Sequence, residues 1–142
     1  MARTPKDTKI DDKYWWDLGL LLLRASHWEA RPGMLAKRAD GTVWRRGELL
    51  WRQADGTSLG RGRESELVPM MYDPGTLGCL LAMVRFAQGD DKAFVMCDYQ
   101  DNYYVYSHDL EGVELDTHIA CSLTSEGEAL VEALLTHGLR HD

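Results

Sequence analysis

The chain has 142 residues, of which 44% are hydrophobic, a composition that excludes a disordered polypeptide and allows one hydrophobic core. Its formal net charge of -7 argues against a general nucleic-acid coat protein, because such proteins neutralise phosphates with surplus Lys and Arg. No apolar run approaches the roughly 20 residues that span a bilayer, and three Cys make no disulfide framework. We therefore expect a soluble protein in the cytoplasm of a bacterial or host cell.

The charge is unevenly distributed along the chain. Residues 1–72 carry 13 Lys and Arg against 10 Asp and Glu, whereas residues 90–132 carry one base against 11 acids, a net charge of -10. Within the first half, residues 31–63 are more basic still. Such asymmetry bears on binding partners and association, and not on the fold.

The N-terminal residues 1–13 are polar, and we expect them to form a flexible arm. Asp11 or Asp12 is a candidate N-cap for a helix over residues 13–25, which contains four consecutive leucines. The same leucine run is compatible with a buried strand, and its periodicity does not distinguish the two.

Residues 31–60 contain the turn signals of a small antiparallel meander. Asp40-Gly41 and Asp55-Gly56 are both strong two-residue turn signals. The tetrapeptide Ala-Asp-Gly-Thr contains each of them and is compatible with an internal duplication, but repeated turn chemistry is the simpler interpretation because repeat folds need three or more units. The expected strands cover 34–38, 42–45 and 48–53, with a fourth piece near Thr57.

The clearest helix of the sequence follows Asp73-Pro74, an N-cap with proline at the first helical position. Leucines recur at helical spacing, and only one charged residue lies between Gly75 and Gln88, so we expect a deeply placed helix. We expect the helix to end at Gly89-Asp90-Asp91, and Gly78 and Ala82 would allow close approach on its third side.

The C-terminal part predicts a sheet and a closing helix. Strands are expected over 93–98, 103–107 and 117–123, and Ser125-x-x-Glu128 is a capping box for a helix that ends near Gly138. The whole chain therefore predicts an α+β fold, in which antiparallel meanders pack against two or three α-helices. We expect a single domain over 14–142, with a basic β-rich part at 31–63 and an acidic helix-sheet-helix part at 73–138.

Two stretches carry a resemblance to known proteins. They are Asp73-Pro74-Gly75-Thr76-Leu77-Gly78-Cys79-Leu80-Leu81-Ala82-Met83-Val84-Arg85 and Thr124-Ser125-Glu126-Gly127-Glu128-Ala129-Leu130-Val131-Glu132-Ala133-Leu134. Together they resemble a group of small uncharacterised proteins from phage and bacterial genomes, which have a similar helix, a short sheet and a closing helix. The resemblance covers mainly residues 73–135. It implies a phage accessory role and no catalytic residue.

The candidate catalytic and metal-binding groups lack a recognisable spacing. Zinc needs about four convergent ligands, and a separation of three on a strand sends His118 and Cys121 to opposite faces. Pairing Cys97 or Cys121 with His108 and Asp109 as nucleophile and base has no supporting local signature. We expect no enzyme, no metal and no cofactor. We also expect three buried thiols, because each cysteine falls on a predicted apolar face: Cys79, Cys97 and Cys121.

Trp and Arg alternate on two neighbouring predicted strands. Exposed aromatic rings flanked by guanidinium groups stack bases and neutralise phosphates, which makes nucleic-acid contact one hypothesis. Strand alternation favours the other interpretation, in which the indoles point inward and the guanidinium groups outward. The residues concerned are Trp44, Arg45, Arg46, Trp51 and Arg52.

The acidic half carries the leading functional hypothesis. Its charge costs stability unless a basic partner, a divalent cation or the protein's own basic meander offsets it. We expect a non-enzymatic accessory protein that docks an acidic face on a basic protein surface, and a phage inhibitor of a host protein is its concrete form. The acidic face consists of Asp98, Asp101, Asp109, Glu111, Glu114 and Asp116.

Two further hypotheses follow from the composition. A small ligand bound at Tyr103, Tyr104 and Tyr106 is one, and a pocket at this cluster would support it. Homo-oligomerisation is the other, with the basic meander of one copy packed on the acidic sheet of a second copy.

Overall fold

The structure is a computed structural model that describes residues 10–60, 62–106, 119–122 and 124–138. These residues form an α+β fold of three α-helices and two antiparallel sheets, as the sequence predicts. The helices are α1 (Asp12–Leu22), α2 (Pro74–Gln88) and α3 (Glu126–Leu135). One sheet has the order β3-β2-β1-β4, with β1 (Leu35–Lys37), β2 (Val43–Arg46), β3 (Trp51–Arg52) and β4 (Val68–Pro69). The other has the order β5-β6-β7, with β5 (Phe94–Cys97), β6 (Tyr103–Tyr106) and β7 (Ala120–Ser122).

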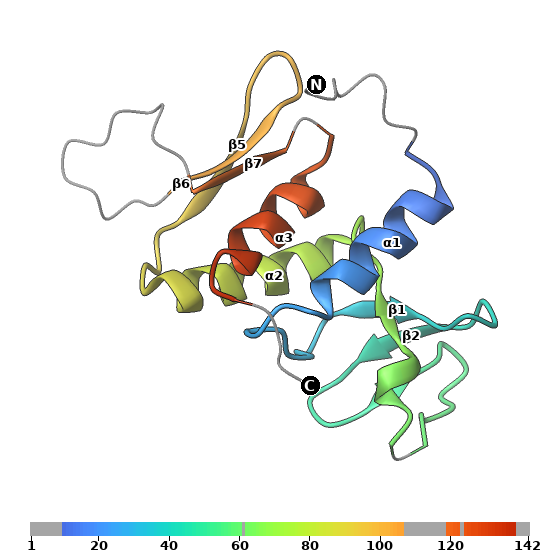
Figure 1. The fold of residues 1–142 in the computed structure, drawn as a ribbon. Coiled ribbons are helices and arrows are strands. Elements are labelled where there is room, and N and C mark those ends of the chain that lie inside the picture. Colours follow the sequence, from blue (N-terminus) through green and yellow to red (C-terminus); the bar gives the residue numbers. More distant parts are fainter. Residues whose placement is uncertain (1–9, 61, 107–118, 123, 139–142) are drawn as a thin grey trace.

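The helices form a layer between the two sheets (Figure 1). Helix α3 packs on the three-stranded sheet and against both other helices, while α1 packs on the β4 edge of the four-stranded sheet. One hydrophobic core runs through these contacts, because buried residues of both sheets and all three helices belong to one cluster. No helix in the described part of the chain is long and apolar enough to cross a membrane.

The candidate N-cap Asp11 is confirmed, and α1 begins one residue earlier and ends three residues earlier than the expected range 13–25. The Asp11 carboxylate accepts a hydrogen bond of 2.9 Å from the Tyr14 backbone N–H, so Asp11 is the N-cap and Asp12 is already helical. The expected arm over 1–13 is therefore too long, although residues 1–9 lie outside the described ranges. The leucine run is helical, since Leu18 and Leu22 are buried while Leu20 is 42% exposed.

The predicted meander exists, but its fourth strand is elsewhere. Strands β1 and β3 lie within the expected ranges and β2 ends one residue beyond its range, at Arg46. The segment near Thr57 makes only an isolated bridge between Arg52 and Ser58. The fourth strand is β4, which pairs with β1 on the other edge. Local turn signals do not reveal this pairing, because about thirty residues separate the two strands and only tertiary packing joins them.

The repeated tetrapeptide forms the same turn twice. Gly41 and Gly56 have φ values of 89° and 92°, and the following threonine N–H donates to the preceding aspartate at 2.9 Å in both turns. Hydrogen bonds from the Thr42 hydroxyl and N–H lower the pKa of Asp40 below its ordinary value, and those from the Thr57 N–H and side chain lower the pKa of Asp55. The repetition is explained by an aspartate that accepts from the backbone next to a left-handed glycine.

Helix α2 has the predicted ends. The Asp73 carboxylate accepts from the Thr76 backbone N–H at 2.9 Å, and Gly89, with φ of 69°, ends the helix. The expectation that α2 is deeply buried is only partly correct. Leu80 is fully buried and Phe86 is 75% exposed. A Cβ added to Gly78 would meet nothing within 4 Å, so this glycine does not mediate close helix packing as expected.

The expectation of three buried thiols is wrong. Cys97 and Cys121 are exposed, and Cys79 is half-buried. On β7 it is Ala120 and Ser122 that face α3, so Cys121 lies on the opposite face. The predicted alternation of that strand is correct, but the inward face was assigned to the wrong residues.

The closing helix α3 is capped by Ser125, whose Oγ accepts from the Glu128 N–H at 3.2 Å. The Glu128 carboxylate does not complete the predicted capping box, because it accepts a hydrogen bond of 2.7 Å from the Ser122 hydroxyl on β7. The Ser122 Oγ in turn accepts from the backbone N–H groups of Thr124 and Ser125. A buried serine therefore joins the strand to the helix.

The first and last helices are joined directly. The Tyr14 hydroxyl lies 2.7 Å from the Ser125 Oγ, and the Ser26 N–H donates to the Gly138 carbonyl at 3.0 Å. Helix α1 also lies unusually close to β4, since a Cβ added to Gly19 would lie 2.5 Å from the Pro69 carbonyl oxygen. This contact places the C-terminal half of α1 against β4.

Candidate binding surfaces

The exposed Arg45 and Arg52 lie on the face of the four-stranded sheet opposite the two tryptophans, whereas Arg46 lies on the tryptophan side. Trp44 and Trp51 are buried, with 3% and 5% of their surface exposed, whereas Arg45 and Arg52 are exposed. The half-buried Arg46 pairs with Trp51 at the end of the sheet and donates to the Gly47 carbonyl at 2.5 Å. The two indoles belong to the core, which removes the stacking surface that the nucleic-acid hypothesis required.

The outer face of the meander carries exposed leucines and not the tryptophans. We call this surface the leucine-arginine face. Leu49 is 85% exposed, Leu50 45% and Val43 40%. A groove of about 740 Å³ runs between these side chains and the two arginines. The face is defined by Leu35, Val43, Arg45, Leu49, Leu50 and Arg52. The groove is also lined by Gly47, Glu48, Gln53 and Ala54.

Arg45 and Arg52 lie directly opposite each other on neighbouring strands. Like charges in this position destabilise a sheet. Arg45 is compensated, because its guanidinium donates to the Gly33 carbonyl at 2.7 Å and forms an ion pair of 3.3 Å with Asp73. Within the described residues Arg52 has no carboxylate partner. Its guanidinium is therefore available to an anionic group on a partner.

The acidic face is described only in part, because Asp109, Glu111, Glu114 and Asp116 lie outside the described residues. The Asp98 carboxylate belongs to the β5–β6 turn. It accepts from the Gln100 and Asn102 backbone N–H groups at 2.8 and 3.0 Å, and from the Tyr104 hydroxyl at 3.3 Å. These hydrogen bonds, of which the one from the Asn102 N–H has the largest effect, lower the pKa of Asp98 below its ordinary range. Asp101 is exposed with φ of 62°.

The tyrosines of β6 do not form one cluster. Tyr104 and Tyr106 lie on the same side of the strand, with ring centroids 6.1 Å apart, whereas strand alternation places Tyr103 on the other side. The pockets described here are lined by other residues. In the described ranges, no group of three or more His, Cys, Asp or Glu side chains could hold a metal ion. His108 and His118 lie outside those ranges.

A second hollow, of about 460 Å³, lies between α1 and the β1–β4 edge. We call it the aromatic pocket. Its walls combine aromatic rings, apolar side chains, three cations and one carboxylate. The rings of Trp15 and Tyr72 lie 5.4 Å apart at an angle of 59°. The lining residues are Asp12, Lys13, Trp15, Trp16, Lys37, Arg38, Ala39, Val68, Pro69, Met70 and Tyr72.

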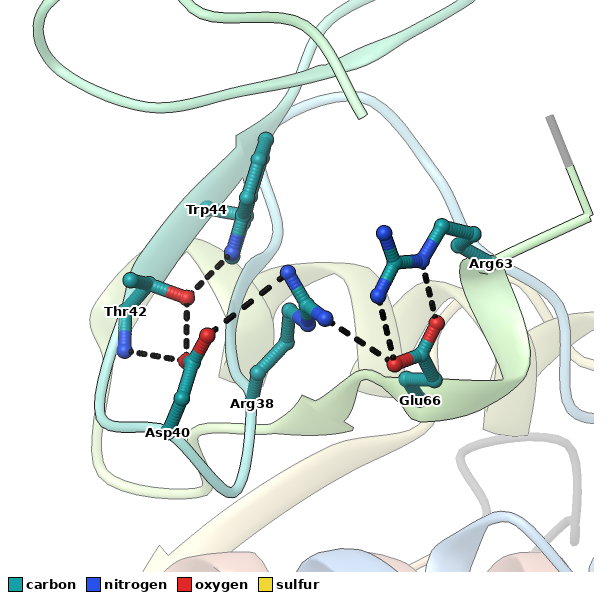
Figure 2. Close-up of polar contacts among 6 residues, drawn as sticks. All are labelled: Arg38, Asp40, Thr42, Trp44, Arg63 and Glu66. Atoms are coloured by element: carbon teal, nitrogen blue, oxygen red, sulfur yellow. Dashed lines mark hydrogen bonds and ion pairs between the residues drawn. The ribbon is translucent and has the colours of Figure 1, made fainter. Parts of the chain in front are cut away.

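One wall of the aromatic pocket is held by a polar chain that Figure 2 shows. The Arg38 guanidinium lies between two carboxylates, 3.7 Å from Asp40 and 3.0 Å from Glu66. Asp40 accepts from the Thr42 hydroxyl at 2.6 Å, and Thr42 accepts from the buried Trp44 indole at 2.9 Å. This series of polar contacts connects the pocket wall to the core residue Trp44.

Glu66 comes from η2 (Glu64–Glu66), a single 3₁₀ turn. It also accepts two hydrogen bonds from the Arg63 guanidinium, at 2.7 and 3.2 Å (Figure 2). These bonds, together with the one from Arg38, lower the pKa of Glu66 to about 2. The turn is therefore fastened to the β1–β2 loop by a carboxylate that stays ionised in mild acid.

The residues of the aromatic pocket and the exposed leucines were missed in the sequence. Leu49 and Leu50 fall in the expected strand over 48–53, but in the structure they belong to the loop between β2 and β3, and loops run over the protein surface. The pocket has no local signal, since its walls come from segments that lie 20 or more residues apart in the sequence.

Comparisons with known proteins do not identify a relative. A scan against protein-family models, a search of the curated proteins and a search of the solved structures each gave no match. The resemblance of residues 73–135 to small phage and bacterial proteins therefore stays a prediction.

Proposed function

We propose that this chain is a non-enzymatic accessory protein that binds another protein through the leucine-arginine face. The observation that carries the proposal is the exposure of Leu49, Leu50 and Val43 around one groove. Contiguous exposed apolar side chains are typical of interaction sites, because leaving them in water has a free-energy cost that a partner removes. A phage inhibitor of a host protein is a member of this class and stays a prediction from the resemblance.

The arginines define the chemistry of the partner. Arg52 lies beside Leu49 and Leu50 in the groove, and a carboxylate placed there would offset the cross-strand repulsion from Arg45. The partner surface is therefore apolar with acidic groups next to the apolar contact. This inverts the sign of the partner expected from the acidic half of the chain.

Selection from a displayed random peptide library on the purified protein tests the proposal. We expect the selected peptides to place Asp or Glu beside Leu, Ile or Phe. Their binding should fall about tenfold in Leu49→Ser and in Arg52→Glu, since each change removes one central contact. Two matched variants on other surfaces should bind normally: Phe86→Ser, which removes an equally exposed apolar side chain, and Arg24→Glu, which reverses an exposed charge.

Equal binding by all four variants, or selected peptides without acidic residues, would refute the proposal. Sedimentation of the protein alone at low and high salt tests the predicted homo-oligomer in the same series. A dimer that Arg52→Glu dissociates would identify a second copy of the chain as the partner.

The acidic face is tested separately. Asp98→Lys would disrupt the β5–β6 turn as well as reverse a charge, because the carboxylate accepts several hydrogen bonds there. Asp101→Lys changes an exposed side chain and leaves that network in place. If the acidic face binds a basic partner, Asp101→Lys should weaken that binding and Leu49→Ser should not.

A further inference from the structure

The aromatic pocket brings three kinds of chemistry together from separate parts of the chain. Trp15 and Trp16 come from α1, Lys37 from β1 and Tyr72 from the segment before α2, and Asp12 lies at the start of α1. Its volume of about 460 Å³ is within the range of about 300–1,000 Å³ typical of small-molecule sites. We propose that the pocket binds a nucleoside monophosphate, independently of the leucine-arginine face.

The aromatic rings provide a surface for the base. Trp15 is partly buried against the core and Tyr72 is 50% exposed, so one ring is fixed and the other remains accessible. Both rings line the pocket, with centroids 5.4 Å apart at an angle of 59°, so a base that stacks on one of them lies close to the other. Stacking of this kind accepts any base, because every base has a π-face.

Lys37 provides the charge for the phosphate. Of the three cations in the lining, Lys13 is paired with Asp17 at 2.5 Å, and Arg38 is held by Asp40 and Glu66. In the described part of the chain Lys37 has neither an ion pair nor a side-chain hydrogen bond, so its ammonium remains for an anionic ligand. Strand β1 holds the Lys37 backbone opposite Val43 and Val68, and the Lys37 side chain lines the pocket.

Asp12 provides a hydrogen-bond acceptor. Its carboxylate accepts hydrogen bonds from sugar hydroxyls or from an exocyclic amino group. A nucleoside monophosphate has a group for each of these residues. Its base would stack on the rings, its phosphate would pair with Lys37, and its hydroxyl or amino groups would donate to Asp12. An aryl carboxylate of the same size satisfies only the first two.

Calorimetric titration with AMP, together with tryptophan fluorescence, tests the proposal on the full chain. We expect saturable AMP binding that changes the fluorescence, and binding about tenfold weaker for adenosine and for inorganic phosphate, since each lacks one anchoring contact. Lys37→Gln and Tyr72→Ala should each weaken AMP binding about tenfold. Their matched controls, Lys92→Gln and Tyr99→Ala, make the same changes at exposed positions away from the pocket and should bind normally.

The results that would overturn the proposal are equally definite. Absence of saturable AMP binding at millimolar concentration would exclude the site. Normal binding by Tyr72→Ala or Lys37→Gln would place any AMP elsewhere on the protein. An equal loss in Lys92→Gln would show general attraction between charges. Circular dichroism of the variants separates loss of binding from loss of fold. Loss of fold is not expected, because Tyr72 is half exposed and the partly exposed Lys37 is replaced by another polar side chain.

Discussion

The close approach of α1 to β4 gives the sharpest stability prediction. In Gly19→Ala the new Cβ would lie 2.5 Å from both the Pro69 carbonyl oxygen and the Val68 Cγ1. Ordinary contacts begin near 3.5 Å, so α1 must move outward by about 1 Å. Overpacking of this kind costs about 1–3 kcal/mol. Alanine also gains about 1 kcal/mol over glycine in a helix interior, which partly offsets the cost.

Gly78→Ala is the matched control. It makes the same substitution inside α2, where the new Cβ would meet nothing within 4 Å. The gain in helix propensity is common to both variants, so the difference between their free energies of unfolding isolates the clash at Gly19, about 1–3 kcal/mol. Thermal unfolding should show a difference in Tm of about 4–12 °C, with Gly78→Ala the more stable. Equal Tm values would show that α1 does not pack on β4 as described.

Three other predictions concern ionisation, a buried hydroxyl and thiol accessibility. Because the pKa of Glu66 is lowered to about 2, its stabilising contribution is complete above the unfolded value of 4.5 and is lost as the pH falls toward 2. The stabilities of the wild type and Glu66→Gln, measured by denaturant unfolding, should therefore converge across this range, and a constant difference would contradict the assignment. Ser122→Ala leaves two backbone N–H groups without an acceptor and should cost about 2 kcal/mol, against no change for the exposed Ser58→Ala in the same assay. An aromatic disulfide reagent should react rapidly with the exposed Cys97 and Cys121 in the native protein and slowly with Cys79, because burial raises the pKa of the Cys79 thiol. Three equal rates would contradict this difference in accessibility.

The features that the sequence predicts correctly depend on chemistry within a few residues. The Asp73 cap, the end of α2 at Gly89 and the two Asp-Gly turns each involve groups no more than four residues apart. Strand alternation was likewise sufficient to place Trp44 and Trp51 inside. These elements could be read from the sequence because the backbone and its nearest side chains determine them.

The errors arise where distant segments decide the outcome. The direction in which β7 faces depends on Ser122, whose hydroxyl binds the start of α3, so periodicity alone could not show that Cys121 is exposed. The pairing of β4 with β1 depends on the packing of α1. The aromatic pocket is lined by α1, the β1 region and the β4 region, and these three segments are far apart in the sequence.

The contact between Tyr14 and Ser125 has a consequence for biosynthesis. The two residues are separated by 111 positions, so α1 leaves the ribosome long before its partner helix is made. During that interval the leucines of α1 lack the α3 surface that covers them in the native protein. Folding should therefore be completed only after α3 emerges, and the nascent chain should expose an apolar helix that chaperones recognise.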